Sequence, residues 1–272
     1  MYKGKVVIIT GGSSGLGKAL AQRFLAQHAA VALVARDGKK LAQVKTDLAG
    51  YLRAGQKLET FSCDVSDISA CEQTLQEIAH QLGAPHILIN SAGIIKEGYF
   101  DTLALSDFRQ VMEINYFGVI NFIRATLPYF NRQGGGRIVN IASLAGKFGS
   151  FGYAAYCGSK FALVGLTETL RLELTPRNIA VQLVCPGEFD TPMTQQLSTS
   201  RTDENRIISQ TIPVLSLKQV TDEVFAGIAK GQYMTIPGRI SRVLEWVNRV
   251  FPGLMRRTLD AKVKKIYAGP SL

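Results

Sequence analysis

The chain has 272 residues, of which 46% are hydrophobic and 19% charged, a composition that suits a large core and excludes a disordered protein. It contains no run of about 18 or more apolar residues, which argues against a membrane-spanning helix. The net charge is +10, but residues 239–272 hold eight Lys/Arg against two Asp/Glu. The basic character therefore belongs mainly to the tail, and we expect no nucleic-acid partner.

The first residues, MYKGKVVIIT, lead directly into a strand-like run with no secretory segment before it, so a cytoplasmic location is expected. The three histidines lack metal-ligand spacing, and the four cysteines form no C-x-x-C pair. We therefore expect no structural metal and reduced thiols at Cys63, Cys71, Cys157 and Cys185.

Apolar, β-branched runs alternate with helical patterns along the chain. Strands are predicted at 5–10, 30–35, 58–65, 86–93, 137–143 and 180–187, and helices at about 16–27, 39–54, 69–82, 105–130 and 156–174. This alternation predicts an α/β protein: a single-domain Rossmann fold with a doubly wound parallel sheet of about seven strands and helices on both faces. We expect one domain over residues 1–238, with a lid at about 188–220, and a helical extension over 239–272.

In a doubly wound sheet the ligand lies beyond the carboxyl ends of the strands, so the residues that follow each strand are the informative ones. The first strand is followed by TGGSSGLG, from Thr10 to Gly17. Glycines allow a tight turn and a close approach of backbone N–H groups to a phosphate, and the next helix directs its positive end there. This turn, which does not follow the G-x-G-x-x-G spacing, predicts a nucleotide site.

The second strand is followed by Ala35-Arg36-Asp37. An acidic residue at this strand end suits the ribose 2′-hydroxyl of NAD, whereas an arginine suits the 2′-phosphate of NADP. Arg36 therefore favours NADP. The alternative is a solvated surface arginine that pairs with Asp37.

The third and fourth strands end in Cys63-Asp64-Val65 and Asn90-Ser91-Ala92-Gly93. Asp64 and Asn90 can bind adenine and ribose, and each can equally cap a turn or the next helix.

Tyr156 and Lys160 lie four residues apart at a helix start, so they share a face of that helix. An ammonium near a tyrosine hydroxyl lowers its pKa from about 10 and makes it a usable acid/base. Ser143 follows the fifth strand and can hold a substrate oxygen at the tyrosine. Tyr153 has no such lysine partner, and we expect it to line the substrate pocket together with Phe148 and Phe151.

With these motifs the sequence resembles the short-chain dehydrogenases/reductases over about Lys3 to Met193. The resemblance implies the catalytic set Asn115, Ser143, Tyr156 and Lys160. It also implies cofactor contacts from Gly11, Ser13, Ser14, Gly15, Leu16, Gly17, Arg36, Asp64, Val65, Asn90, Ala92, Gly93, Tyr156, Lys160, Pro186, Gly187, Phe189 and Thr191. The family's Asn-Asn-Ala-Gly motif reads NSAG here, and Ser14 stands where some NADP-preferring members carry a basic residue.

The same resemblance implies a mechanism. The nicotinamide of NADP(H) exchanges hydride with a carbonyl carbon, Tyr156 exchanges the proton, and Ser143 binds the oxygen. Lys160 lowers the pKa of Tyr156 and binds the ribose, and Asn115 holds a water that links Lys160 to solvent. It further implies a homodimer or homotetramer that associates through the helix carrying Tyr156 and Lys160.

The lid and tail bear on the substrate. Apolar residues in the lid suit a hydrophobic carbonyl or alcohol substrate, or simply dock the lid on the body. In the tail, residues 239–266 form a basic amphipathic pattern that can contact a membrane surface or pack on the body or a partner subunit, and Pro252 should end or kink that helix. The apolar stripe consists of Ile240, Val243, Leu244, Val247, Val250, Phe251 and Leu254.

Two stretches, AGKFGSFGYAAYCGSKFAL and NRIISQTI with the following KQV, resemble the 3-ketodihydrosphingosine reductase branch of the family. That resemblance implies an NADP(H)-dependent reductase of a lipid-like ketone. The alternatives are a 3-ketoacyl thioester or steroid ketoreductase, and a non-catalytic NADP-binding regulatory protein on the same fold.

Overall fold

The computed structural model describes residues 2–197, 201–209 and 212–268. The lid residues 198–200 and 210–211 and the tail residues 269–272 therefore lie outside the described residues. Within them, a parallel sheet contains β1 (Val6–Thr10), β2 (Ala30–Ala35), β3 (Leu58–Ser62), β4 (Ile87–Asn90), β5 (Gly136–Ile141), β6 (Ile179–Val184) and β7 (Met234–Thr235).

The strand order is β3-β2-β1-β4-β5-β6-β7, and every neighbouring pair is parallel. The chain leaves β1 in one direction along the sheet and returns to its other side at β4, where Thr10 pairs with Asn90. This reversal is the crevice where ligands bind in such sheets. The predicted Rossmann fold is confirmed; β7, only two residues long, was not located from the sequence.

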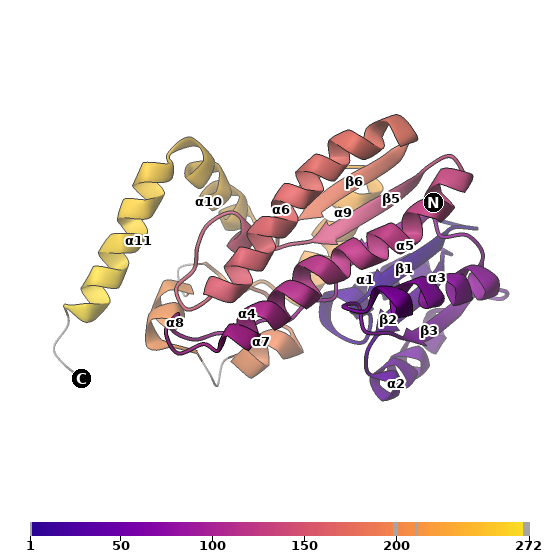
Figure 1. Ribbon diagram of the computed structural model, residues 1–272, viewed down its shortest axis with the longest axis horizontal. Coiled ribbons are helices and arrows are strands. Elements are labelled where there is room, and N and C mark those ends of the chain that lie inside the picture. The colour runs from indigo at the N-terminus through magenta and orange to yellow at the C-terminus, as the bar shows by residue number, and fades with distance from the viewer. Residues whose placement is uncertain (1, 198–200, 210–211, 269–272) are drawn as a thin grey trace.

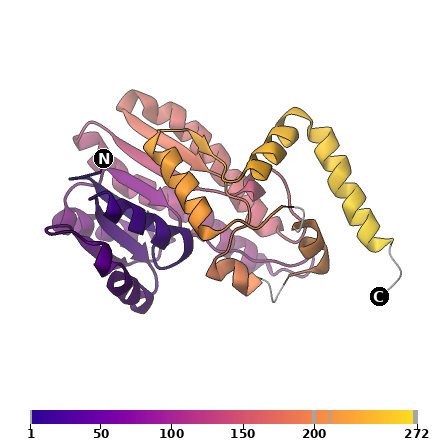
Figure 2. The ribbon, with the colours of Figure 1, turned by 180° about the vertical axis from the view of Figure 1, so that it is seen from behind.

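Helices cover both faces of the sheet (Figures 1 and 2). One face packs against α1 (Gly15–Ala26), α2 (Gly38–Leu48) and α9 (Leu217–Ala229). The other packs against α3 (Ile68–Leu82), α5 (Gly118–Arg132) and α6 (Ala154–Leu174), with α4 (Leu105–Met112) joined to α5 through a π-helical turn, Glu113–Phe117. Short 3₁₀ turns lie at Ala49–Tyr51, Leu144–Gly146 and Thr175–Arg177.

Strand β1 shows why the sheet needs helices on both sides. All five of its residues are buried; Val6 and Ile8 belong to one core, and Val7 and Ile9 to the other. Side chains alternate between the faces of a strand, so a continuous apolar run places an apolar surface on each face.

The lid contains α7 (Pro192–Leu197) and α8 (Asp203–Ser209), and the tail contains α10 (Arg239–Val250) and α11 (Pro252–Tyr267). The predicted break at Pro252 is confirmed: Phe251 leaves the helical conformation and Pro252 begins α11.

Helix α10 leads away from the sheet, and α11 runs back beside the lid and contacts α8 (Figures 1 and 2). There the Glu204 carboxylate accepts hydrogen bonds from the hydroxyls of Tyr99 at 3.0 Å and Tyr267 at 2.6 Å. The lid residue Glu204 thus joins the tail to the body.

None of the helices in the described ranges is both long and apolar enough to cross a membrane.

Candidate active site

A cavity of about 500 Å³ opens at the carboxyl ends of the central strands and extends under the lid to α10 and α11. Seventeen of the residues expected to bind cofactor line it, and so does Ser143. These seventeen are Gly11, Ser13, Ser14, Gly15, Leu16, Gly17, Arg36, Asp64, Val65, Ala92, Gly93, Tyr156, Lys160, Pro186, Gly187, Phe189 and Thr191.

The glycine-rich turn after β1 is closely packed against its surroundings. Gly11 has φ +66°, and a Cβ there would lie 2.8 Å from the backbone nitrogen of Ala92. A Cβ on Gly17 would lie 2.5 Å from the Gly11 carbonyl oxygen. The turn can therefore keep its shape only with glycine at both positions, and it leaves the N-terminus of α1 open to the cavity. This cradle fits a dinucleotide phosphate.

Thr10 fixes the neighbouring loop after β4. Its buried hydroxyl accepts hydrogen bonds from the backbone N–H groups of Ser91 and Ala92, both at 3.1 Å. In the sequence, Thr10 is the first residue of the glycine-rich motif, and the motif predicts no separate role for it. The structure makes it a positioning residue that holds two loops of the crevice together.

Arg36 lies at the edge of the cavity with 57% of its side chain exposed. Its guanidinium is 4.0 Å from the Asp64 carboxylate, whereas Asp37 caps α2 by accepting a hydrogen bond from the Lys40 backbone N–H. Lys40 also lines this part of the cavity, which the sequence analysis missed. Two cations, one after β2 and one on α2, thus face the position expected for the adenosine ribose of a dinucleotide.

Asn90 was expected to contact cofactor, but its side chain is buried and does not line the cavity. Its amide donates a hydrogen bond to Asn140 on β5 at 2.9 Å, and Asn140 donates to the hydroxyl of Thr167 on α6 at 3.0 Å. In the structure Asn90 therefore belongs to a polar chain that joins β4, β5 and α6.

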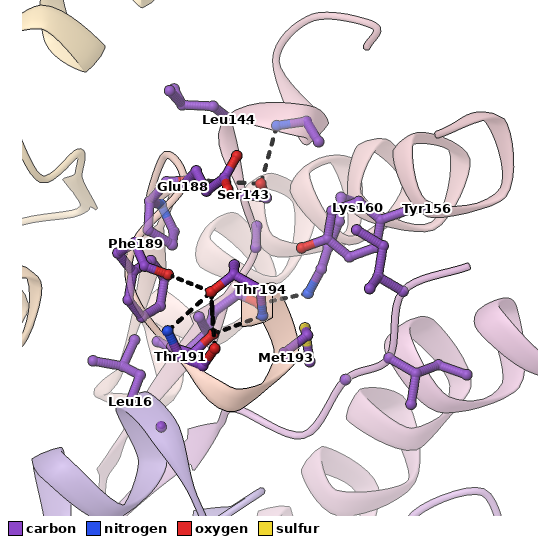
Figure 3. A pocket seen from close by; sticks show the side chains of 18 of the residues that line it. Leu16, Ser143, Leu144, Tyr156, Lys160, Glu188, Phe189, Thr191, Met193 and Thr194 are labelled. Atoms are coloured by element: carbon purple, nitrogen blue, oxygen red, sulfur yellow. Dashed lines mark hydrogen bonds between the residues drawn. The ribbon is translucent and has the colours of Figure 1, made fainter. Parts of the chain in front are cut away.

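Ser143 and Tyr156 come from β5 and α6 and meet at the centre of the cavity. The Ser143 hydroxyl donates to the Pro186 carbonyl oxygen at 3.4 Å and accepts from the Ala145 backbone N–H at 3.1 Å (Figure 3). Burial raises the pKa of Tyr156 to about 12, and the hydrogen bond with Ser143 opposes that rise. The phenol is consequently held protonated at neutral pH.

Lys160 is buried beneath the tyrosine. Its ammonium donates to the Ile141 carbonyl oxygen at 2.9 Å and lies 5.6 Å from the centre of the Tyr156 ring. Burial lowers the pKa of Lys160 to about 8. Burial is the largest influence on the pKa of each group, and the ammonium is bound to a backbone carbonyl. That Lys160 lowers the pKa of Tyr156 stays a prediction.

Asn115 lies in the π-helical turn and is fully buried outside the cavity lining. Its side-chain oxygen accepts from the Ile94 N–H at 2.8 Å, and its amide donates to the Ile94 carbonyl oxygen and the Ser159 hydroxyl. These bonds tie the loop after β4 to α6, next to Lys160. Local π-helical turns often occur at functional sites, where they redirect a single side chain.

Beyond Tyr156 the cavity is mostly apolar. The predicted pocket residues Phe148 and Tyr153 line it; Phe151 does not, because it packs against Tyr99 with ring centres 6.0 Å apart. Sequence analysis missed Glu188 and Arg201, which line the same space. No spacing pattern marked them, since neither Glu188 nor Arg201 lies in a strand or helix. The apolar lining residues include Ile95, Leu144, Met193, Leu244, Met255 and Leu259.

Comparisons with known proteins support this site. The family model described as short chain dehydrogenase matches residues 5–202. The chain belongs to the short-chain dehydrogenase family. Strands β1 to β6, the glycine-rich turn and the Ser143, Tyr156 and Lys160 group all lie within the matched residues, and β7 lies beyond them.

Other members of the family are similar to this chain over most of its length. A bovine (Bos taurus) 3-ketodihydrosphingosine reductase is 37% identical over 232 residues, which are 85% of this chain and 70% of that protein. A short-chain dehydrogenase from Sphingobium yanoikuyae in complex with NADPH aligns with TM-score 0.76 and 29% identity over 93% of this chain and 95% of that one.

A family member from Burkholderia phymatum in complex with NAD has TM-score 0.82 and 24% identity, over 93% of this chain and 95% of that one, a likeness in fold alone. The family thus supports an oxidoreductase that acts on an alcohol or ketone with a nicotinamide dinucleotide.

Proposed function

We propose that this protein is an NADP(H)-dependent oxidoreductase that interconverts a ketone and a secondary alcohol on a hydrophobic, lipid-like substrate. The observation that carries the proposal is the position of Tyr156. It stands where the dinucleotide cradle meets an apolar cavity, with Ser143 and Lys160 beside it. A protonated hydroxyl at that junction serves the reduction of a carbonyl.

Each residue of the group has its own task. When bound, NADPH supplies the hydride. Tyr156 donates the proton to the carbonyl oxygen, and the Ser143 hydroxyl gives that oxygen a hydrogen bond, so that two donors stabilise the charge that develops there. Lys160, buried below the ring, provides a positive charge on the same side. Asn115 acts as a positioning residue, since it anchors the loop after β4 to α6.

The preference for NADP(H) rests on charge. Arg36 and Lys40 line the cavity at the carboxyl end of β2, and both side chains are largely exposed, at 57% and 72%. A 2′-phosphate there meets two cations. Asp37 and Asp64 line the same part of the cavity, but Asp37 caps α2 and Asp64 lies 4.0 Å from Arg36.

The lipid-like substrate is supported by the cavity and by the relatives. The apolar lining runs from Leu144 and Phe148 to Met255 and Leu259 on α11, a path that suits an alkyl chain. Bovine 3-ketodihydrosphingosine reductase, the relative described above, is named for a long-chain ketone. A 3-ketoacyl thioester or a steroid ketone is the alternative substrate.

The test is the oxidation of NADPH, followed by absorbance, with a long-chain 3-ketosphinganine and a short 3-ketoacyl thioester side by side. We expect turnover of the long-chain ketone. Turnover of the thioester alone would replace the sphingoid substrate by a fatty-acyl one, and turnover of neither would remove the proposed substrate class.

We also propose that the protein works in the cytoplasm, at the surface of an anionic membrane, through α10 and the start of α11. Most of the apolar stripe predicted there is exposed: Val243 is 57% exposed, Phe251 51% and Leu254 58%, and the neighbouring Trp246 is 56% exposed. Leu244 and Val247 are half-buried, and Leu244 lines the cavity. Exposed arginines 249, 256 and 257 lie on the same segments. An apolar face bordered by cations suits anionic lipids. Since Met255 and Leu259 also line the cavity, its outer wall would face the bilayer that holds the substrate.

A second copy of the chain is the partner that we propose for α6. Along this helix Phe161 is 46% exposed and Leu172 63% exposed. Two exposed glycines lie on the same face, Gly158 before Phe161 and Gly165 between Phe161 and Leu172. A homodimer or homotetramer would cover this stripe. Analytical sedimentation of the protein and of Phe161→Glu tests the proposal. We expect the intact protein to sediment as an oligomer, and the mass of a single chain for both proteins would contradict the proposal.

A further inference from the structure

Two of the four cysteines lie together at the adenosine end of the cavity. The Cys63 thiol donates to the Asp64 carbonyl oxygen at 3.5 Å. The Cys71 thiol reaches the same oxygen at 3.9 Å and the Val65 carbonyl oxygen at 3.5 Å. A hydrogen bond also joins the two thiols to each other, and both side chains are buried. A disulfide can join two thiols in such contact after a small shift of one side chain.

The two cysteines differ in their access to the cavity. Among the four cysteines, all of which lie in the described part of the chain, Cys63 alone lines the cavity. It comes directly before Asp64, whose carboxylate lies 4.0 Å from the Arg36 guanidinium. Cys71 lies in the first turn of α3 and is fully buried. A small oxidant in the cavity therefore meets Cys63, and Cys71 stands behind it.

The two thiols also differ in acidity. Their mutual hydrogen bond is the largest influence on both groups: it lowers the pKa of Cys63 to about 7, against the effect of burial, and it raises the pKa of Cys71. A hydrogen bond with Thr74 also favours the Cys63 thiolate, and the charges of Asp64 and Asp67 oppose it. A thiolate is the form that attacks a peroxide, and a neighbouring thiol completes the disulfide.

The turn between the two cysteines belongs to the cofactor site and is fixed by hydrogen bonds. The Asp64 carboxylate accepts from the backbone N–H of Ser66 at 3.0 Å and from its hydroxyl at 2.7 Å. The Val65 carbonyl oxygen accepts from the Asn121 amide on α5 at 3.0 Å, and Asp67 caps α3. Both Asp64 and Val65 line the cavity. A disulfide would remove two S–H donors from this turn and draw its ends together, so the cavity wall between them has to shift.

We propose that Cys63 and Cys71 are a redox-sensitive dithiol that a hydroperoxide converts to a disulfide, and that this disulfide weakens the binding of the dinucleotide. With hydrogen peroxide, the Cys63 thiolate attacks one oxygen and the O–O bond breaks. The departing hydroxide takes a proton from solvent, which leaves a sulfenic acid and one water. The Cys71 sulfur then attacks the Cys63 sulfur, and its proton leaves with the hydroxyl group as a second water.

The electrons of this reaction balance, since the peroxide gains two and the pair of thiols loses two. A dithiol reductant reverses the step by thiol–disulfide exchange. In a reducing compartment such a disulfide is transient, as expected of a redox-sensing pair. The free thiols of the structure are then the reduced, cofactor-binding state.

The first experiment treats the intact protein with hydrogen peroxide and locates the product by mass spectrometry. Proteolytic cleavage at the aspartates between Cys63 and Cys71 should release two fragments that a disulfide still joins. In Cys71→Ala this link cannot form, and Cys63 should proceed to a sulfinic acid that dithiothreitol does not reverse. Cys157→Ala removes a buried thiol that does not line the cavity and should keep the link. Free thiols at both Cys63 and Cys71, under peroxide that oxidises the exposed Met193, would overturn the inference.

The second experiment measures the effect on the cofactor. The quantity is Kd, from fluorescence titration, for whichever of NADPH and NADH binds more tightly, so the result does not depend on the proposed cofactor preference or reaction. We expect peroxide to raise this Kd at least about tenfold in the intact protein and in Cys157→Ala, and dithiothreitol to restore it. The Kd of Cys63→Ala, whatever its starting value, should not respond to peroxide.

Cofactor binding and oxidation should also oppose each other in the reverse direction. Because coupling between two equilibria is reciprocal, saturating cofactor should disfavour the disulfide as much as the disulfide disfavours cofactor. We therefore expect the same peroxide treatment to join fewer chains through Cys63 and Cys71 when cofactor is bound. A disulfide that forms without a change in Kd, or an equal change in Kd for Cys63→Ala, would overturn the inference.

Discussion

The ammonium of Lys160 lies 5.6 Å from the centre of the Tyr156 ring and donates its hydrogen bond to the Ile141 carbonyl oxygen at 2.9 Å. The lysine therefore lies under the tyrosine without bonding its hydroxyl. Burial sets the pKa of both groups in opposite directions, upward for the phenol and downward for the ammonium. This arrangement keeps the tyrosine protonated for the reduction of a carbonyl.

Replacement of Tyr156 by phenylalanine should remove the proton donor while leaving the cavity wall in place. We expect kcat for ketone reduction to fall by about 10² to 10⁴, the usual contribution of general acid catalysis. Affinity for NADPH, measured by fluorescence titration, should change little. Tyr51→Phe, at an exposed position outside the cavity, is the control. Full turnover by Tyr156→Phe would remove Tyr156 from the mechanism.

Glu97 should make folding stability depend on pH. Its pKa in the folded protein is about 7, raised by burial from an ordinary value of 4.5. The folded state therefore binds this proton more tightly than the unfolded state, and the resulting stabilisation is complete below about pH 4.5 and lost as the pH rises through 7. In Glu97→Gln the free energy of unfolding, from urea titrations at pH 5, 6, 7 and 8, should decrease less over that window. Parallel curves for the two proteins would contradict the raised pKa.

Arg36→Ala should weaken the binding of NADPH much more than the binding of NADH. Loss of a charge-assisted contact to a 2′-phosphate corresponds to about 1.5–3 kcal/mol, or roughly tenfold to a hundredfold in Kd. Lys40→Ala should act in the same direction, and Arg53→Ala, exposed outside the cavity, should not. The measurement is Kd for both cofactors by fluorescence. Equal weakening of NADPH and NADH would remove the reason for preferring NADP.

The exposed apolar side chains of α10 should be required for binding to lipid vesicles. We expect the intact protein to sediment with vesicles that contain anionic lipid, less so at high salt, because both apolar insertion and charge contribute. Val243→Ser with Trp246→Ser should reduce the bound fraction severalfold. Tyr51→Ser removes an aromatic side chain that is 43% exposed elsewhere and should have no effect. Identical sedimentation of all three proteins, or none by the intact chain, would favour a packing role for the tail.

Much of the fold was readable from the sequence, because local patterns carry it. Continuous apolar runs such as Val6–Thr10 have to be buried on both faces, and the alternation with helices predicts a parallel sheet. The glycine turn was equally readable, since Gly11 and Gly17 occupy positions that admit no side chain. Tyr156 and Lys160 share a helix, so a spacing of four residues places them together. Pro252, which cannot continue a helix, marked the break between α10 and α11.

Other features depend on contacts between residues far apart in the chain. Asn90 looked like a cofactor ligand at its strand end, but the register of β4 beside β5 directs its amide to Asn140. Burial of each side chain, and not the spacing between them, is the largest influence on the pKa values of Tyr156 and Lys160. A spacing rule describes neighbours on one element and contains no information on how deeply they are buried.

The sequence by itself determined the fold class, the dinucleotide cradle and the tyrosine proposed as proton donor, because each depends on the conformational limits of a short segment. Only the tertiary structure brought Glu188 and Arg201 together beside Ser143, with Glu97 behind them. Those residues come from separate loops, and the free energy of a buried charge depends on every group around it. No local pattern encodes that sum, so this charged part of the cavity lining was visible only in the folded chain.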